Sequence, residues 1–291
     1  MFQILLNILF YTSLYLLLSL SISIIYFPTK FFHLAHAGVI ALGAYFVFMV
    51  SAGMGMPLYI AVLSAAALAT AVGMGCEVLV YKPMRKRGYP PLAFLIASIG
   101  IYVVLQNLIS LFFGDDTKVI RTGEVTVGHE IFGAYITTVQ IVTIVVSLVL
   151  FTGVNLFLKH TETGKAMSAV SSNAFLANIF GINSDRVILI SFAVGSALGA
   201  IAGILSAMDT NMTPTFGFNL LLYGVIAMII GGVGSTSGLV WGSLLVASAQ
   251  HLAAYYIDTK WIEAVAFMIL IVFLIWRPLG FSGNKLKKVE I

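Results

Sequence analysis

Residues 4–27 read "ILLNILFYTSLYLLLSLSISIIYF", a run without a single Asp, Glu, Lys or Arg. A helix of about 20 mostly apolar residues is long enough to cross the roughly 30 Å hydrocarbon layer of a bilayer. The run therefore predicts a transmembrane helix. Further apolar runs follow along the chain, so this first one begins a repeated pattern rather than forming an isolated anchor.

The composition indicates a polytopic membrane protein. The chain has 291 residues, of which 60% are hydrophobic and only 9% are charged, and its mean hydropathy is +1.06. Soluble domains carry about 25% charged residues, so this chain could not cover a water-facing surface. A single cysteine, Cys76, excludes an internal disulfide and a multi-cysteine metal site. The opening "MFQILLNILF" has no basic residue, so we expect the first run to be retained rather than cleaved as a signal peptide.

The apolar runs predict the architecture. We expect about nine spans, near residues 4–27, 34–51, 57–80, 92–113, 136–158, 184–208, 218–231, 238–257 and 261–276. The second and seventh are short or rich in glycine, so eight or ten spans remain possible. Because lipid cannot satisfy open backbone groups, everything in the membrane must be helical. We therefore predict an all-α, polytopic transmembrane helical bundle that forms a single transmembrane domain over residues 1–291.

The distribution of charge predicts the orientation. Three segments are basic: 81–91 with Lys82, Arg85, Lys86 and Arg87, 159–186 with Lys159, Lys165 and Arg186, and the tail with Arg277, Lys285, Lys287 and Lys288. Loop 114–135 is acidic, with Asp115, Asp116, Glu124 and Glu130 against Lys118 and Arg121. Basic loops stay in the cytoplasm, so nine spans place the N-terminus outside and the C-terminus inside. The net charge of +4 is divided among short loops, which gives no surface for nucleic acid.

Several function classes lack their motifs here. The chain has no G-x-x-x-x-G-K-[ST] sequence, so we expect it to be non-catalytic and not to hydrolyse ATP itself. No span carries an arginine ladder or paired carboxylates, which argues against a voltage sensor and weakens an ion-coupled carrier. Only Glu77 lies well inside a predicted span, five residues before Lys82. Its carboxylate is either a proton or substrate site or, as we favour, an ion pair with the neighbouring basic cluster.

The segment 159–185 is too long for a tight turn and too polar for a span. Its middle, from Gly164 to Phe180, has apolar residues at a nearly helical period, and Gly181 follows as a candidate helix end. The residues of this period are Met167, Val170, Ala174, Ala177 and Phe180. We expect Asn183 or Ser184 to cap the next span. The pattern predicts a short amphipathic helix at the cytoplasmic surface, which either docks a partner or lies passively at the interface.

Small residues recur within and between the spans. Gly195, Gly199 and Gly203 form a stripe with a spacing of four residues, which suits either tight packing inside the chain or an interface with another subunit. The run "GGVGSTSG" at 231–238 cannot continue a stable helix, so it predicts a break between half-spans or a tight turn.

Polar side chains in apolar surroundings are candidates for the substrate path. The stretch "FFHLAHAGVIALGAY" at 31–45 contains His33 and His36, but two imidazoles without a sulfur or carboxylate ligand make a poor metal site, so we predict none. His36 either starts a short or discontinuous span and bonds nearby backbone, or faces a translocation path. Gln106 and Asn107 are adjacent amides that need partners inside a span. Because they point about 100° apart, only one of them can face a narrow path, and we favour Asn107.

The sequence resembles the permease subunits of branched-chain amino acid ABC importers, a family that also includes urea and short-amide permeases. The resemblance covers most of the chain and rests on "HLAHAGVIALGAY" (33–45), "YKPMRKRG" (81–88), "ASIGIYVVLQN" (97–107), "TETGKAMSAVSSNAFLANIFGIN" (161–183), "ISFAVGSALGAIAGIL" (190–205) and "GGVGSTSGLVWGSLL" (231–245). Where the family commonly has an Asn-Phe-Ala-His-Gly-Glu-like run, this chain has "LAHAG", with Ala37 after His36 and no acid.

The resemblance implies a heteromeric importer in the bacterial cytoplasmic (inner) membrane. It implies four kinds of partner: a second related permease, two ATP-binding subunits that hold ATP and Mg, an extracytoplasmic solute-binding protein, and membrane lipid. No cofactor is expected in this chain. By the same resemblance, 164–181 is a coupling helix for the ATPase, with contacts expected at Gly164, Met167, Val170, Ala174, Ala177 and Gly181. A urea or short-amide permease is the alternative within the family, and a stand-alone channel or secondary carrier is the alternative outside it.

Overall fold

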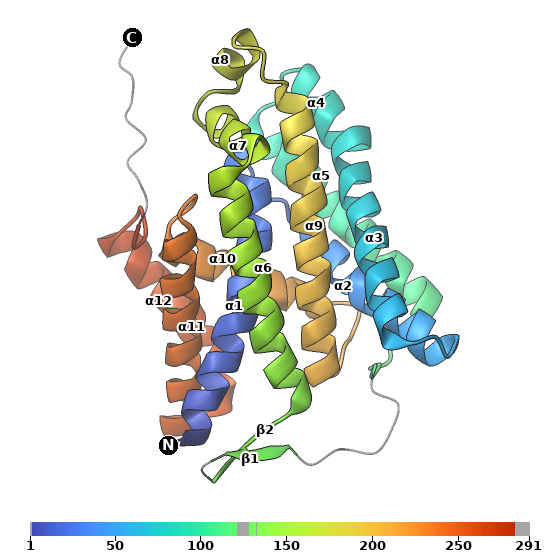
Figure 1. The fold of residues 1–291 in the computed structure, drawn as a ribbon, viewed down its shortest axis with the longest axis vertical. Helices are drawn as coiled ribbons and strands as arrows, with labels where there is room; N and C mark the ends of the chain where they lie inside the picture. Colours follow the sequence, from blue (N-terminus) through green and yellow to red (C-terminus); the bar gives the residue numbers. More distant parts are fainter. Residues whose placement is uncertain (1, 121–127, 132, 283–291) are drawn as a thin grey trace.

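The computed structural model describes residues 2–120, 128–131 and 133–282. The predictions about Arg121, Glu124, Lys285, Lys287 and Lys288 concern residues outside these ranges. Within them the chain is almost entirely helical, which confirms the all-α, polytopic bundle (Figure 1).

The helices follow the apolar runs closely. They are α1 (Phe2–Thr29), α2 (His36–Val47), α3 (Leu58–Cys76), α4 (Lys82–Lys86), α5 (Pro91–Phe113), α6 (Thr138–His160), α7 (Glu162–Ser172), α8 (Ala174–Ile179), α9 (Ser184–Asp209), α10 (Phe216–Gly231), α11 (Thr236–Tyr256) and α12 (Ile262–Trp276). The π-helical segments η1 (Phe48–Gly53) and η2 (Glu77–Tyr81) continue α2 and α3, and the 3-10 turn η3 (Thr259–Trp261) precedes α12.

Each of the nine predicted spans coincides with a helix or with a continuous pair of helical segments. In the described part of the chain, seven of these are long and apolar enough to cross a membrane, and α10, also apolar, is shorter. The count of nine crossings therefore stays a prediction.

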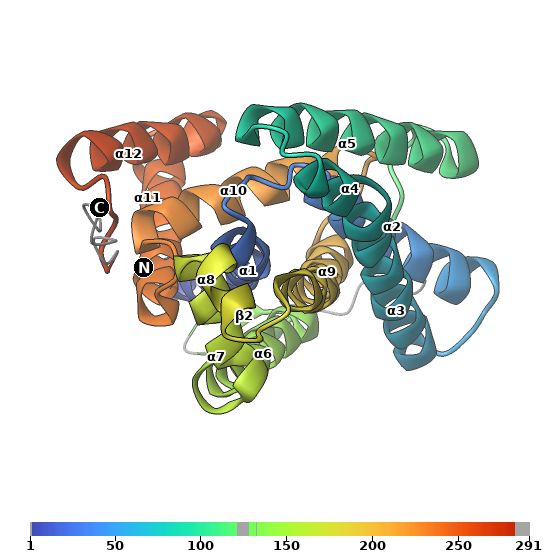
Figure 2. The same ribbon diagram turned by 90° about the horizontal axis from the view of Figure 1, so that it is seen from above.

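The core of the bundle is built around α1. This helix packs against α6, α9, α10 and α11, and α9 packs in turn against α2 and α3. Seen from above, α1 and α9 lie inside the bundle, whereas α5 and α12 lie along one edge on either side of α10 (Figure 2). Because α1 is buried over most of its length, its apolar residues contact protein on all sides and need no polar face.

The two ends of the bundle differ. The helices α4, α7 and α8 lie together at one end, and the hairpin of β1 (His129–Ile131) and β2 (Ala134–Ile136) lies at the other (Figure 1). The basic segments 81–91 and 159–186 therefore share an end, and acidic Glu130 lies at the opposite end. The positive-inside rule requires the two basic segments to lie on the same side of the membrane, and their common end agrees with it. Which side of the membrane each end faces remains a prediction.

The described part of loop 114–135 contains a short β-hairpin, which the helical prediction for the spans does not cover. The strands β1 and β2 pair antiparallel around Gly133, whose φ of +74° suits a turn. The side chain of Gln3 completes the edge of β2, donating to the Tyr135 carbonyl at 2.9 Å and accepting from its amide at 2.8 Å. A hairpin is possible here because the loop lies beyond the ends of the spans, where water can satisfy a strand edge.

The segment 164–181 forms two helices instead of one. Asn173 has an extended backbone, and its side-chain oxygen accepts from the Leu176 amide at 3.0 Å, so it ends α7 and caps α8. A short polar side chain that bonds nearby backbone breaks a helix in this way.

Asn183 caps α9 as expected, accepting from the Arg186 amide at 3.0 Å. The run 231–238 contains a tight turn between α10 and α11, with positive φ at Gly232 and Gly234, which is one of the two predicted alternatives.

Candidate functional site

The glycine stripe of α9 packs inside the chain. A β-carbon at Gly195 would lie 2.5 Å from Ile25 of α1, and one at Gly203 would lie 2.5 Å from the Ile40 carbonyl oxygen of α2. Gly199 fits against the ring of His36. The stripe therefore lets α1, α2 and α9 approach closely, and these three positions are closed to an interface with another subunit.

The two histidines of residues 31–45 have separate partners. His36 is 1% exposed, and its Nε2 lies 3.1 Å from the Ser21 hydroxyl on α1. His33 precedes α2, and its Nδ1 lies 2.9 Å from the hydroxyl of Tyr81 in η2. Burial lowers the pKa of His33 well below its ordinary value, and nearby His36 lowers it further, so His33 is neutral at pH 7. Both rings thus fasten the start of α2 to neighbouring helices.

An ionic cluster joins α3–α4 to the start of α9. Glu77 is 1% exposed and pairs with Arg85, which confirms the ion pair with the basic cluster. Arg85 also reaches Asp185 at 3.1 Å, and Lys82 reaches the same carboxylate at 3.4 Å. Removing one member would leave a buried or half-buried charge unpaired, so the cluster holds these helix ends together.

The predicted coupling residues divide into two groups. Gly164, Met167, Val170 and Ala177 are buried against the rest of the chain, while Ala174 and Gly181 are exposed. Gly164 lies so close to the last turn of α6 that a β-carbon there would meet the Leu158 carbonyl oxygen at 2.5 Å. Three residues of the predicted apolar period, Met167, Val170 and Ala177, therefore form the inner face of α7 and α8, which fixes the segment to the bundle, whereas Ala174 and Phe180 of the same period are exposed.

The outer side of α8 carries large apolar side chains, of which the sequence analysis had singled out only Phe180. We call them the apolar face of α8: Phe175, Leu176, Ile179 and Phe180, with exposed fractions of 73%, 48%, 63% and 82%. They lie at the end of the bundle with α4 and α7, beyond the ends of the long helices (Figure 1). They form two adjacent pairs four residues apart, 175–176 and 179–180, a spacing that places them on one side of a helix. An exposed patch of this kind marks a protein or membrane contact.

The path candidates Gln106 and Asn107 lie on the outer side of α5. Asn107 is exposed, and its amide donates to the Val103 carbonyl of its own helix at 2.7 Å. Gln106 is half-buried. In contrast, His36 is enclosed by α1 and α9, so the structure does not bring the three candidates together.

The helices α5, α10 and α12, which lie along one edge of the bundle (Figure 2), carry polar residues that are exposed or half-buried. We call this set the polar face: Gln106 and Asn107 of α5, Asn219 and Tyr223 of α10, and Glu263 of α12. The rings of Tyr102 and Phe218 join α5 to α10 with centroids 5.3 Å apart, and the Glu263 carboxylate interacts with Tyr223. Figure 2 shows α10 between α5 and α12 along this edge. Polar groups facing lipid tails are costly, so those of this set at the depth of the tails would be covered by protein or water in the membrane.

Comparison with known proteins gives a match over nearly the whole chain. The family described as "Branched-chain amino acid transport system / permease component" matches residues 4–274. The high-affinity branched-chain amino acid transport system permease protein LivH of Escherichia coli K12 is 31% identical over 285 residues, covering 94% of this chain and 92% of LivH. BraD of Pseudomonas aeruginosa, which carries the same description, has the same identity and coverage. A probable LivH of Methanocaldococcus jannaschii is 23% identical over 96% of this chain and 92% of its own. No solved structure matches significantly.

Proposed function

This chain belongs to the family of branched-chain amino acid transport system permease components and is a permease subunit of an ABC importer, and we propose that it forms half of the path for branched-chain amino acids. The observation that carries the proposal is the 31% identity to LivH and BraD along 94% of the chain. A match of that extent favours a subunit of an assembly over a stand-alone channel or carrier.

The proposed assembly has a second related permease, two ATP-binding subunits and an extracytoplasmic solute-binding protein, in the bacterial cytoplasmic membrane. ATP and Mg would be held by the ATP-binding subunits, and this chain would remain non-catalytic. The whole of residues 1–291 would act as one permease domain. Binding and hydrolysis of ATP would move α7 and α8, and the spans packed against them would open the path alternately to each side.

The apolar face of α8 supports a docking role for this segment. The four side chains stand outside the bundle, and a protein groove would remove their surface from water, as it does for other amphipathic helices. When ATP binding moves α7 and α8, the buried residues Met167, Val170 and Ala177 would transmit this movement to the rest of the bundle. The contact surface we propose therefore consists of Phe175, Leu176, Ile179 and Phe180, with Ala174 and Gly181 at its margins, and the inner residues transmit rather than dock.

The polar face supports the proposal that the substrate path runs along α5, α10 and α12. Amide, hydroxyl and carboxylate groups can replace part of the hydration of a zwitterionic amino acid, whose ammonium group suits Glu263 and Tyr223. The second permease would close the path from the other side. His36 would act indirectly, by holding the start of α2 against α9.

A substrate panel tests the proposed function. Cells that express the complete importer should accumulate labelled leucine, isoleucine or valine, and unlabelled competitors of the same class should suppress the uptake. Deleting this permease alone should abolish it. Competition by urea or a short amide, without competition by leucine, would replace the branched-chain assignment with the alternative within the family.

A further inference from the structure

The residue that follows α1 has an unusual backbone conformation. Lys30 has a φ of +60°, and in the described part of the chain it is the only residue other than glycine with a positive φ. Its amide donates to the Tyr26 carbonyl at 2.8 Å and so closes the last turn of α1. Helices commonly end in this left-handed conformation, but the residue there is usually glycine, because a β-carbon makes the conformation costly. A lysine that accepts this cost indicates a role for its side chain.

The Lys30 side chain reaches the end of α7. Its ammonium donates a hydrogen bond to the Ser171 hydroxyl at 2.9 Å, and Ser171 is buried. Ser171 is the penultimate residue of α7, which ends at Ser172. The carbonyl groups in the last turn of a helix carry a partial negative charge, which a nearby cation stabilises. Lys30 therefore holds the end of α7 by a charged hydrogen bond that the helix dipole reinforces.

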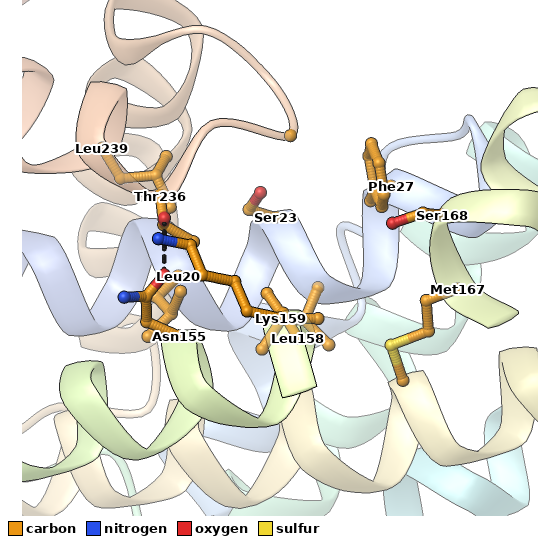
Figure 3. Close-up of a pocket in the computed structure, with 12 residues that line it drawn as sticks. Leu20, Ser23, Phe27, Asn155, Leu158, Lys159, Met167, Ser168, Thr236 and Leu239 are labelled. Carbon is orange, nitrogen blue, oxygen red and sulfur yellow. Dashed lines mark hydrogen bonds between the residues drawn. The ribbon is translucent and has the colours of Figure 1, made fainter. Parts of the chain in front are cut away.

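The same ammonium links α7 to a further part of the bundle. It lies 5.1 Å from the centre of the Phe27 ring, within the range of a cation–π contact. The ring packs in turn against the loop between α10 and α11, since a β-carbon at Gly234 would lie 2.5 Å from it. Phe27 and Ser168 of α7 line one pocket, and Figure 3 shows both at the end away from the Lys159 ammonium. The end of α1 thus contacts both α7 and the turn before α11.

The contact lies next to the break between α7 and α8. Asn173, which ends α7 and caps α8, follows Ser171 by two residues, and the apolar face of α8 begins at Phe175. A displacement of α8 therefore reaches the last turn of α7 first. Because α1 is the helix around which the core is built, the hydrogen bond of Lys30 leads from that turn directly to the centre of the bundle.

We propose that Lys30 is a positioning residue for transport. Its contact with Ser171 passes the movement of α7 and α8 to α1 and, through Phe27, to the turn between α10 and α11. This role rests on the coupling role proposed above for α7 and α8. Lys30 belongs neither to the polar face nor to the apolar face of α8, so it acts by holding α7 in place and not by touching the substrate or the ATPase.

Replacing Lys30 by glycine separates this role from a role in stability. Glycine adopts a positive φ freely, so the relaxed backbone offsets the lost side-chain contacts and the melting temperature should change little. The amount of leucine transported per ATP hydrolysed, measured with the complete assembly in proteoliposomes, should fall at least about fivefold, the lower end of a typical coupling between two sites.

Two further variants and a control define the contact. Ser171→Ala should cause the same loss as Lys30→Gly, and the double variant should lose no more than either one, because both changes remove one hydrogen bond. Lys30→Arg should retain the ratio, since a guanidinium can donate to the same hydroxyl. Lys165→Ala removes an exposed charge of α7 and should leave the ratio unchanged.

Hydrogen exchange of the purified permease tests the contact without transport. The amides in the last turn of α7 should exchange about tenfold faster in Lys30→Gly, the effect expected for one hydrogen bond to a charged group. The amides of α9, which the change does not touch, should keep their rates.

Three results would overturn the proposal. One is an unchanged ratio of transport to hydrolysis in Lys30→Gly and Ser171→Ala. Another is an equal loss in Lys165→Ala, which would show a general sensitivity to charge on α7. The third is unchanged exchange in the last turn of α7. If the unchanged assembly transports no leucine, the proposed function fails and this coupling role with it, whereas faster exchange in Lys30→Gly would still establish the contact.

Discussion

The ring of His36 lies against the bare backbone of Gly199: a β-carbon at position 199 would come within 2.6 Å of the His36 Nε2. The same nitrogen lies 3.1 Å from the Ser21 hydroxyl. One contact therefore joins α9, α2 and α1, the three helices at the centre of the bundle. It exists only because position 199 has no side chain.

Replacing Gly199 by alanine should destabilise the permease. The added methyl group must displace the ring from its hydrogen bond or separate α9 from α2, which costs about 1–3 kcal/mol for overpacking a core. Thermal unfolding of the purified protein in detergent measures the loss. Gly153→Ala on α6 is the control, because nothing lies within 4 Å of a β-carbon there. That variant should be unchanged or slightly more stable, since alanine favours a helix by up to about 1 kcal/mol. Equal stabilities for the two variants would contradict the packing described here.

Removing the aromatic rings from the apolar face of α8 should separate the permease from its ATPase. Phe175→Ser with Phe180→Ser truncates two exposed side chains, each with the size and position of an interface anchor worth about 2 kcal/mol or more. We expect at least about tenfold less ATPase to co-purify, with normal permease levels in the membrane. Lys165→Ala, an exposed change on α7, is the matched control. Retention of the ATPase by the double variant would show that α8 is only a connector.

A charge at Ala177 should act differently from a charge at Ala174. Ala177 is 5% exposed and faces the bundle, so Ala177→Glu buries an unpaired carboxylate and lowers the stability of the permease itself. Ala174 is exposed, so Ala174→Glu should leave folding intact and weaken only the ATPase contact. Membrane levels and co-purification of the ATPase, measured together, separate the two effects. Identical behaviour of the two variants would mean that the inner and outer faces of α8 are assigned incorrectly.

The polar face should be open to water in the assembled importer. In a Cys76→Ser background, Asn107→Cys and Asn219→Cys should react with a water-soluble, charged thiol reagent. Leu148→Cys should not, because Leu148 is exposed on α6, at the opposite edge of the bundle, where lipid would cover it (Figure 2). Addition of leucine together with the binding protein should slow the labelling of the two path positions. If all three cysteines stay unlabelled, this face is not part of an aqueous path.

A pair of reporter fusions should test the orientation. Basic residues on α4 and in 159–186 share one end of the bundle, and the tail from residue 277 is basic as well. Since basic loops stay in the cytoplasm, a reporter fused after residue 288 is expected there. A reporter inserted near residue 120 is expected outside. Finding both reporters on the same side would overturn the predicted topology.

Much of the fold could be predicted because a bilayer requires it. Apolar length alone located the helices, and glycine content located the turn at 231–238. The break at Asn173 could not be predicted, because a local hydrogen bond from one side chain decided against a weakly stable helix. The stripe Gly195–Gly199–Gly203 was recognised, but its partner helix depends on tertiary contacts that sequence spacing does not encode. For the same reason the apolar period of 164–181 combined buried residues, such as Met167 and Val170, with exposed Phe180, and it did not separate the inner side of the segment from its exposed apolar face.

The most direct test of the importer assignment is the energy source for uptake. Proteoliposomes would contain the complete assembly, with the binding protein and labelled leucine on one side and ATP on the other. We expect uptake only with ATP, none when the Walker lysine of the ATP-binding subunits is replaced, and no ATPase activity from this chain alone. Leucine uptake into vesicles that contain only this chain, driven by an ion gradient without ATP, would contradict the assignment and identify a stand-alone carrier.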